Sequence, residues 1–200
     1  MKNLENKFLI SSNMKTKLFS ISAPSGCGKS TLIRELLSSN ESLKQSVSFT
    51  TRNPRESEVN GEDYFFVSKN DFDEMIKKNE LIEYAEVYGN FYGTQKKWLQ
   101  EELNKNLAHI LLELDIQGAM SIKKIFPESV RIFINPPNLG ILEKRLYKRG
   151  KDSDKQIKIR LAKAEEEISI GSNFEYVIMN DNFEDCLKSL KDIIINNNHG

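Results

Sequence analysis

Residues 23–30 read Ala-Pro-Ser-Gly-Cys-Gly-Lys-Ser, a glycine-rich segment placed between an apolar run and a helical pattern. The apolar run covers residues 17–23, and residues 29–37 carry apolar side chains at helical spacing. The segment matches the Walker A pattern except at its first position, where alanine replaces glycine. A strand, a glycine turn and a helix in this order predict a phosphate-binding loop in an α/β fold.

The residue types of this loop indicate its chemistry. Gly26 and Gly28 let backbone N–H groups turn inward around a polyphosphate, and the helix N-terminus adds a partial positive charge of about half a unit. Lys29 would reach the outer phosphates, and the Ser30 hydroxyl would join the shell of a Mg²⁺ ion. Alanine at position 23 is compatible with the loop unless the backbone there needs a positive φ.

A second strand–helix–strand pattern follows later in the chain. Residues 109–115 are nearly all apolar, 117–125 have helical spacing, and 130–134 are β-branched and aromatic. Strands that are apolar throughout are usually covered on both faces, which favours a mainly parallel sheet between helix layers. We expect the remaining core elements to be a strand over 176–179 and helices over 139–148, 156–170 and 183–195.

Residues 48–98 differ from their surroundings and are predicted to be an insertion into this core. They contain strand candidates at 64–67 and 81–87, two short helices, and many Gly, Asn and Tyr residues. The core would then comprise residues 17–47 and 99–200, with a lid at about 138–170. Residues 1–16 are expected to be a flexible N-terminal extension.

Composition excludes several classes of function. Lys plus Arg equal Asp plus Glu at 29 each, so no overall field favours nucleic acid or an anionic membrane. Cys27 and Cys186 suit neither a disulfide framework nor metal-ligand spacing. No apolar run approaches the length of about 18 residues that a membrane span needs. We expect a cytoplasmic protein that binds neither nucleic acid nor membranes, and a homodimer is left open.

Asp115 ends the apolar run and is placed like a Walker B carboxylate at the carboxyl edge of a parallel strand. There it would orient a water on Mg²⁺ or one of the phosphate-binding arginines. The alternative is that Asp115 caps the following helix.

Several separated segments resemble the guanylate kinase family. Residues 50–64 fit that family's GMP-binding pattern, T-T-R-x-P-R-x-x-E-x-x-G-x-x-Y. Further matches at 89–94, 114–118, 145–150 and 160–161 extend the resemblance over about residues 17–190. It implies a P-loop three-layer α/β sandwich with an inserted mixed α+β GMP-binding subdomain and a mobile helical lid. ATP and GMP are the implied partners and Mg²⁺ the implied cofactor.

Two arginines in this segment are suited to one phosphate. Arg52 and Arg55 flank Pro54, whose fixed φ helps to hold a turn that presents both guanidinium groups. Two forked, permanently charged donors can chelate a phosphate monoester. Tyr64 and Tyr92 would add neutral phenolic donors, as the resemblance also implies.

Glu83 matches the glutamate that binds the base in guanylate kinases. An ionised carboxylate accepts hydrogen bonds only, and guanine offers adjacent N1–H and N2 donors, whereas adenine presents a lone pair at N1. Thr94 and Ser48 match hydroxyl residues near the guanine. Alternatively, Thr94 caps a helix that begins near Gln95, and Ser48 is an ordinary strand residue.

Two lid arginines and an asparagine complete the implied site. Arg149 and Arg160 match residues that contact the ATP phosphates when the lid closes. Asn180 matches a position near the adenine, although its Asn-Asp-Asn context is equally typical of a turn. Three other residues are interpreted as structural, namely a helix-surface cation, a strand-start residue and a packing aromatic: Arg145, His109 and Trp98.

The residue sets that the resemblance implies are as follows. The ATP contacts are Ser25, Gly26, Cys27, Gly28, Lys29, Ser30, Thr31 and Asn180, and the GMP contacts are Ser48, Arg52, Arg55, Tyr64, Glu83, Tyr92, Thr94 and Asp115. The cations expected to act in catalysis are Lys29, Arg52, Arg149 and Arg160.

The expected reaction is direct in-line phosphoryl transfer from ATP to GMP, and to dGMP, without an enzyme nucleophile. One alternative is an inactive interaction module that binds phosphopeptides, but such a module should lack the P-loop or the lid cations. Another is a P-loop kinase for a different phosphorylated acceptor, such as a ribose phosphate, against which Glu83 and Thr94 argue.

Overall fold

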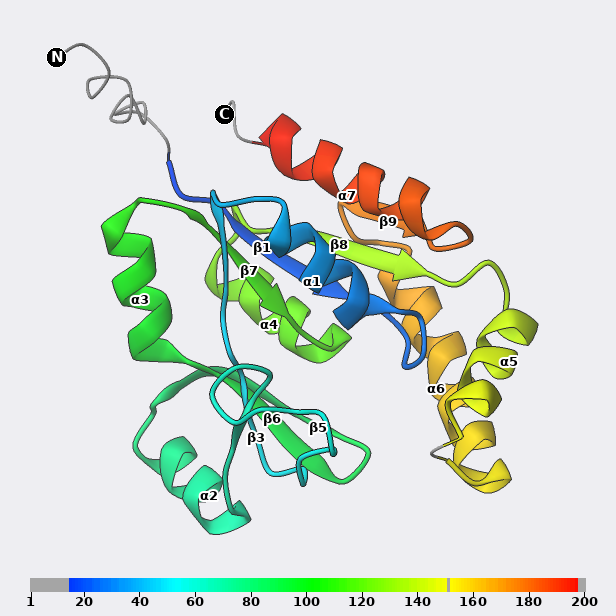
Figure 1. The fold of residues 1–200 in the computed structure, drawn as a ribbon. Helices are drawn as coiled ribbons and strands as arrows, with labels where there is room; N and C mark the ends of the chain where they lie inside the picture. The colour runs from blue at the N-terminus through cyan, green and yellow to red at the C-terminus, as the bar shows by residue number, and fades with distance from the viewer. Residues whose placement is uncertain (1–14, 151, 198–200) are drawn as a thin grey trace, which may run out of the picture.

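The computed structural model describes residues 15–150 and 152–197, and its core is a five-stranded sheet (Figure 1). All hydrogen-bonded neighbours in this sheet are parallel. The strand order is β2 (Leu43–Gln45), β7 (His109–Glu113), β1 (Leu18–Ser22), β8 (Val130–Asn135) and β9 (Tyr176–Met179). The α/β class and the parallel pairing predicted from the apolar strands are confirmed.

Side chains of the central strands point alternately to the two faces of the sheet, and an apolar core lies on each face. Phe19 and Ile21 of β1 enter one core, and Leu18 enters the other. The first core includes side chains of α1 (Lys29–Ser38) and α7 (Phe183–Asn196), and the second those of α3 (Lys96–Lys105) and α4 (Ile116–Ile125). Figure 1 shows α1 and α7 on the near side of the sheet and α4 on the far side. The result is a three-layer sandwich.

Residues of the predicted insertion form a second, mixed sheet. Its order is β4 (Phe65–Phe66), β3 (Phe49–Thr50), β6 (Asn90–Gln95) and β5 (Leu81–Val87). β3 pairs with β4 in parallel and with β6 antiparallel, and β5 pairs with β6 antiparallel. A small core of Phe72, Met75 and Leu81 joins this sheet to α2 (Lys69–Lys77). The sheet therefore has apolar support of its own, and Ile82 of β5 also packs against the second main core.

Two helices, α5 (Leu139–Arg149) and α6 (Asp154–Gly171), form the region predicted as a lid. Leu142 and Leu146 anchor α5 in the main core. α6 begins with a capping box in which Ser153 and Gln156 satisfy each other's backbone N–H groups. The helix therefore starts two residues before position 156, where apolar spacing alone placed it.

Some elements differ from the sequence predictions. Strands β2, β3 and β6 were not predicted, because two of them are very short and β6 reads Asn-Phe-Tyr-Gly-Thr-Gln, a composition typical of turns. Of the two helices expected within 48–98, α2 lies inside that range and α3 extends to Lys105. Of the predicted N-terminal extension, residues 1–14 lie outside the described residues, whereas the Thr16 amide donates to Asn106 Oδ1 at 2.6 Å. In the part of the chain that the structure describes, no helix is long and apolar enough to cross a membrane.

Candidate active site

A cavity of about 460 Å³ lies between the glycine-rich loop, the second sheet and the α5–α6 pair. The residues predicted to bind nucleotides come from distant parts of the chain, and all of them line this cavity except Thr94 and Asn180. The cavity therefore brings together the P-loop, the Arg52/Arg55 pair and both lid arginines in one space.

The loop has the backbone that its sequence predicts. Gly26 and Gly28 have φ values of 93° and 85°, and residues other than glycine rarely adopt such values. A Cβ on Gly26 would also lie 2.9 Å from Leu146 Cδ2 of α5. Ala23 does not have a positive φ. Alanine at the first Walker position is therefore compatible with the loop geometry.

Lys29 and Ser30 converge on a carboxylate that the sequence analysis missed. Ser30 Oγ donates to Glu113 Oε1 at 2.7 Å, and Lys29 Nζ lies 3.7 Å from the same oxygen. Lys29 Nζ also donates to the Leu114 carbonyl at 3.0 Å. The available signal was that Glu113 is the only charged residue in the apolar run 110–114.

Behind the loop, Cys27 and Asn180 brace its backbone. The Cys27 thiol is buried and faces the Ile134 carbonyl at 3.5 Å, and burial raises its pKa to about 12. Asn180 Nδ2 donates to the Cys27 carbonyl at 2.6 Å. Asn180 also lines a smaller cavity of about 260 Å³ together with Thr31 and Phe183. The Cys27 amide donates to the Pro24 carbonyl at 3.1 Å, so both backbone groups and the thiol of Cys27 serve to hold the shape of the loop.

Arg145 is not the surface cation that the sequence suggested. Its guanidinium donates to the Asn180 carbonyl at 3.0 Å, and its side chain contributes to both cavities. Helical spacing placed Arg145 on the polar side of α5, and only the tertiary packing shows that this side faces Asn180.

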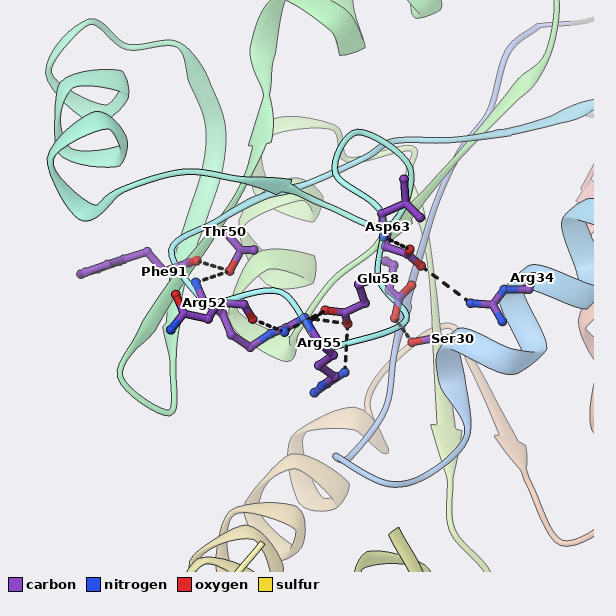
Figure 2. A network of polar contacts seen from close by, with 11 residues as sticks. Ser30, Arg34, Thr50, Arg52, Arg55, Glu58, Asp63 and Phe91 are labelled. Atoms are coloured by element: carbon purple, nitrogen blue, oxygen red, sulfur yellow. Dashed lines mark hydrogen bonds and ion pairs between the residues drawn. The ribbon is translucent and has the colours of Figure 1, made fainter. Parts of the chain in front are cut away.

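On the opposite wall, a carboxylate joins the two arginines of the predicted phosphate cradle, and Figure 2 shows both arginines directed at it. Glu58 accepts from Arg52 Nη1 and Nη2 at 2.9 and 2.8 Å, and from the Arg55 amide and Nη1 at 2.8 and 3.2 Å. Burial alone would raise the pKa of the Glu58 carboxyl, but the bonds from Arg52 and Arg55 lower it overall. The sequence analysis quoted Glu58 within the motif and assigned it no role.

Aromatic rings support this cradle. The Arg52 guanidinium lies 5.4 Å from the ring centre of Tyr64 and 5.7 Å from that of Phe66. The rings of Tyr64 and Tyr92 are 5.9 Å apart, edge to face. Burial raises the pKa of the Tyr64 hydroxyl, so it remains a neutral hydrogen-bond donor at physiological pH.

Deeper in the cavity, Glu83 is a buried acceptor, 6% exposed. Its Oε1 accepts from Thr94 Oγ1 at 2.6 Å across the β5–β6 pair. Burial, reinforced by the nearby Asp115, raises the pKa of the Glu83 carboxyl to about 7. A Cβ on Gly118 of α4 would lie 2.7 Å from Glu83 Oε2, so the glycine makes room for the carboxylate.

The structure decides three of the alternative roles. Thr94 lies in β6 and the N-cap of α3 is Gln95, so the helix-cap interpretation of Thr94 is wrong. Ser48 is buried at the cavity wall just before β3 and outside the strand. Asp115 is the N-cap of α4, accepting from the Gly118 amide at 2.9 Å, and it also lines the cavity.

The lid arginines enter the cavity from α5 and α6. Arg160 Nη1 donates to Ser25 Oγ of the P-loop at 2.8 Å. Asp152, which the sequence analysis did not single out, accepts from both Arg149 and Arg160. Arg149 Nε is buried and has no hydrogen-bond partner among the described residues. Of the Arg149 guanidinium, Nη2 is thus paired with Asp152 and Nε is left without a partner within these residues.

One further carboxylate lines the cavity on α6. Glu167 is 9% exposed, and its Oε2 has no hydrogen-bond partner within the described residues. Burial raises its pKa to about 7. No motif marked this residue in the sequence.

Known proteins with similar sequences and structures belong to one family. A sequence model of the family described as guanylate kinase matches residues 15–197. The guanylate kinase of Nitrosospira multiformis is 46% identical over 177 residues, which cover 88% of this chain and 84% of the relative. That of Vibrio parahaemolyticus is 46% identical over 182 residues, which cover 90% and 87%. Among solved structures, the guanylate kinase of Anaplasma phagocytophilum matches with a TM-score of 0.79 and 32% identity, over 94% of this chain and 89% of that one.

Proposed function

Because this chain belongs to the guanylate kinase family, we propose that it transfers the γ-phosphoryl group of ATP directly to the phosphate of GMP, giving GDP and ADP. The chain is a kinase, and its family phosphorylates GMP with ATP. The proposal adds the route, which is a single in-line displacement without a phosphoenzyme. It also adds dGMP as an acceptor. The assigned GMP contacts are made to the base and the phosphate, and dGMP differs from GMP only in its sugar.

This route is supported by one observation. The P-loop around Lys29 and the Arg52/Arg55 pair line the same cavity of about 460 Å³. Lys29 stands on one side of it, and Arg52 and Arg55 stand on the other. A phosphorus atom can then pass between two bound nucleotides without crossing bulk water. Exclusion of water would also limit the competing hydrolysis of ATP.

The expected work of the protein is to position the reactants and neutralise charge. Phosphoryl transfer needs little covalent chemistry from an enzyme, so cations around the moving group should dominate the rate. The GMP phosphate has a second pKa of about 6 and is largely ionised at neutral pH, so no general base is required. We assign charge neutralisation to Lys29, Arg52, Arg149 and Arg160, all of which line the cavity.

Guanine selectivity is assigned to Glu83. Ionised Glu83 can accept from the N1–H and N2 groups of guanine, and the hydroxyls of Thr94 and Ser48 suit its O6. Adenine would offer the buried carboxylate no donor at N1, and the lost pairing would cost about 1–3 kcal/mol. In the free protein the Thr94 hydroxyl donates to Glu83. When guanine binds, this hydroxyl would leave Glu83 and donate to O6, and the guanine donors would take its place at the carboxylate.

The oxygen groups beside Lys29 fit Mg²⁺. Ser30 Oγ and Glu113 Oε1 are 2.7 Å apart at the cavity wall, and Mg²⁺ binds proteins through one or two oxygen ligands while keeping waters and substrate phosphates. Ser30 would hold the ion, and Glu113 or Asp115 would act through water. When bound, Mg²⁺ would neutralise charge on the ATP phosphates.

A panel of acceptors tests the assignment. With Mg²⁺-ATP present, ADP release is measured with GMP, dGMP, AMP, UMP and ribose 5-phosphate at equal concentrations. We expect turnover with GMP and dGMP and at least tenfold less with the other three. Equal turnover of AMP, or preference for the ribose phosphate, would contradict the assignment of Glu83 to the base.

A further inference from the structure

Tyr88 stands at the tip of the β5–β6 hairpin in an unusual backbone conformation. Val87 pairs with Asn90, so the turn consists of Tyr88 and Gly89 alone. Their φ values are 50° and 78°, and a two-residue turn of this kind normally has Asn, Asp or Gly at its first position. A tyrosine there adopts a left-handed backbone that its side chain disfavours. Such outliers persist where the surrounding structure or the function requires them.

Two cations from the lid helix α6 cover the Tyr88 ring. The Arg160 guanidinium lies 4.5 Å from the ring centre and Lys163 Nζ lies 4.9 Å from it. Residues three apart share one face of a helix, so both cations reach the ring from the same side of α6. The Tyr88 hydroxyl is buried and makes no hydrogen bond of good geometry with a described residue. Burial raises its pKa to about 12, and the nearby Arg160 opposes that rise. Arg160 and Lys163 therefore contact the face of the ring, and Arg160 also lies near its hydroxyl.

This contact connects two parts of the site that bind different nucleotides. The same hairpin carries Glu83, assigned to the guanine, and Tyr92, assigned to the acceptor phosphate. Arg160 also donates to Ser25 of the P-loop at 2.8 Å, on the donor side. Tyr88 thus joins the hairpin assigned to the acceptor to Arg160, a cation assigned to the donor site.

We propose that Tyr88 is a positioning residue that couples the two nucleotide sites. Its ring, at the hairpin tip, holds the Arg160 guanidinium beside Ser25 of the P-loop, and acceptor nucleotide bound to the same hairpin should strengthen this contact. GMP bound to the hairpin should therefore tighten binding of the donor nucleotide, and the donor should tighten GMP by the same factor. The inference rests on the proposed function and names a residue outside the assigned binding sets.

Two substitutions separate this role from folding. Tyr88→Asn removes the ring and places a residue in the turn that tolerates the left-handed conformation, so the hairpin should be at least as stable as before. Tyr88→Phe keeps the ring face and removes the hydroxyl. Tyr84→Asn is the matched control, because Tyr84 is an exposed tyrosine of the same hairpin whose ring faces Phe72 of α2.

The measurement is the dissociation constant of a non-hydrolysable ATP analogue with Mg²⁺, with and without saturating GMP. Wild type should bind the analogue more tightly with GMP. Tyr88→Asn should reduce that GMP-dependent gain by about three- to thirtyfold, the range of a cation–π contact, without lowering the melting temperature. Tyr88→Phe and Tyr84→Asn should keep the gain.

Three outcomes would overturn the inference: no GMP-dependent gain in wild type, an unchanged gain in Tyr88→Asn, or an equal loss in Tyr88→Phe. Failure of the proposed function looks different, because wild type would then release no ADP with GMP. Normal turnover by wild type together with an unchanged gain in Tyr88→Asn would refute the coupling alone.

Discussion

Glu83 is a buried carboxylate with a raised pKa, and we assign recognition of the base to it. The resemblance predicted its role at the base, and the carboxylate chemistry explained why guanine fits. The sequence did not indicate its surroundings, namely the hydroxyl of Thr94 at 2.6 Å and the space left by Gly118. Those contacts join β5, β6 and α4, which meet only in the tertiary structure.

The raised pKa of Glu83 predicts a pH dependence of GMP binding. Only the ionised carboxylate can accept from both the N1–H and N2 donors of guanine, and its pKa in the free protein is about 7. The KM for GMP should therefore fall by about tenfold between pH 6 and pH 8. Glu83→Gln cannot ionise and should keep only the slope that comes from the GMP phosphate. Identical pH profiles for wild type and variant would rule out this role.

The raised pKa of Glu83 also predicts a pH dependence of stability. Ionisation of this carboxyl favours GMP binding but destabilises the folded protein. The pKa of Glu83 is about 7 in the folded state against an ordinary 4.5, so the folded state binds more protons between these values. The free energy of unfolding should fall as pH rises through this window. At pH 8, Glu83→Gln should stabilise the protein by about 1–3 kcal/mol, measured by denaturant unfolding, and by much less at pH 4. A destabilised variant at pH 8 would show that the ionised carboxylate is well solvated.

At the scale of the elements, long periodic segments were predicted well. The strands 81–87 and 176–179 have the predicted bounds, and α1 differs from its prediction by a single residue. Short strands were not predictable, because β2 and β3 depend on partners in other parts of the chain. The start of α6 was missed because its first turn is set by the Ser153 capping box and not by apolar spacing.

Asp152 joins the two helices of the predicted lid through ion pairs. Its carboxylate is 6% exposed and pairs with Arg149 of α5 and Arg160 of α6. The sequence presented it only as one charge in a charged stretch. Its position between the two helices gives both arginines a fixed orientation toward the cavity.

Substitution of Asp152 should therefore affect catalysis. We expect Asp152→Asn to lower kcat about tenfold, because both arginines lose a charge-assisted partner that holds them in place. Asp154→Asn, at an exposed position two residues further on, is the matched control and should leave kcat within about twofold. Steady-state rates at saturating GMP and ATP provide the comparison. Equal effects of the two substitutions would mean that the Asp152 pairs do not orient the lid.

Across the whole molecule, a chain of zero formal net charge brings six of its 29 Lys and Arg residues to one cavity. Lys plus Arg balance Asp plus Glu at 29 each, yet five arginines and Lys29 line this space. Carboxylates accompany them: Glu58 holds Arg52 and Arg55, Asp152 holds Arg149 and Arg160, and Glu113 contacts Lys29 and Ser30. The motifs identified the cations, but the paired carboxylates became evident only from the fold.

The central claim is that the phosphoryl group passes directly between two nucleotides in this cavity. ATP made chiral at the γ-phosphorus with oxygen isotopes and sulfur reports the number of displacements at that atom. We expect inversion of configuration at the transferred phosphorus of the product, because a single in-line displacement inverts it once. Retention of configuration would require two displacements through an enzyme-bound intermediate and would contradict the central claim.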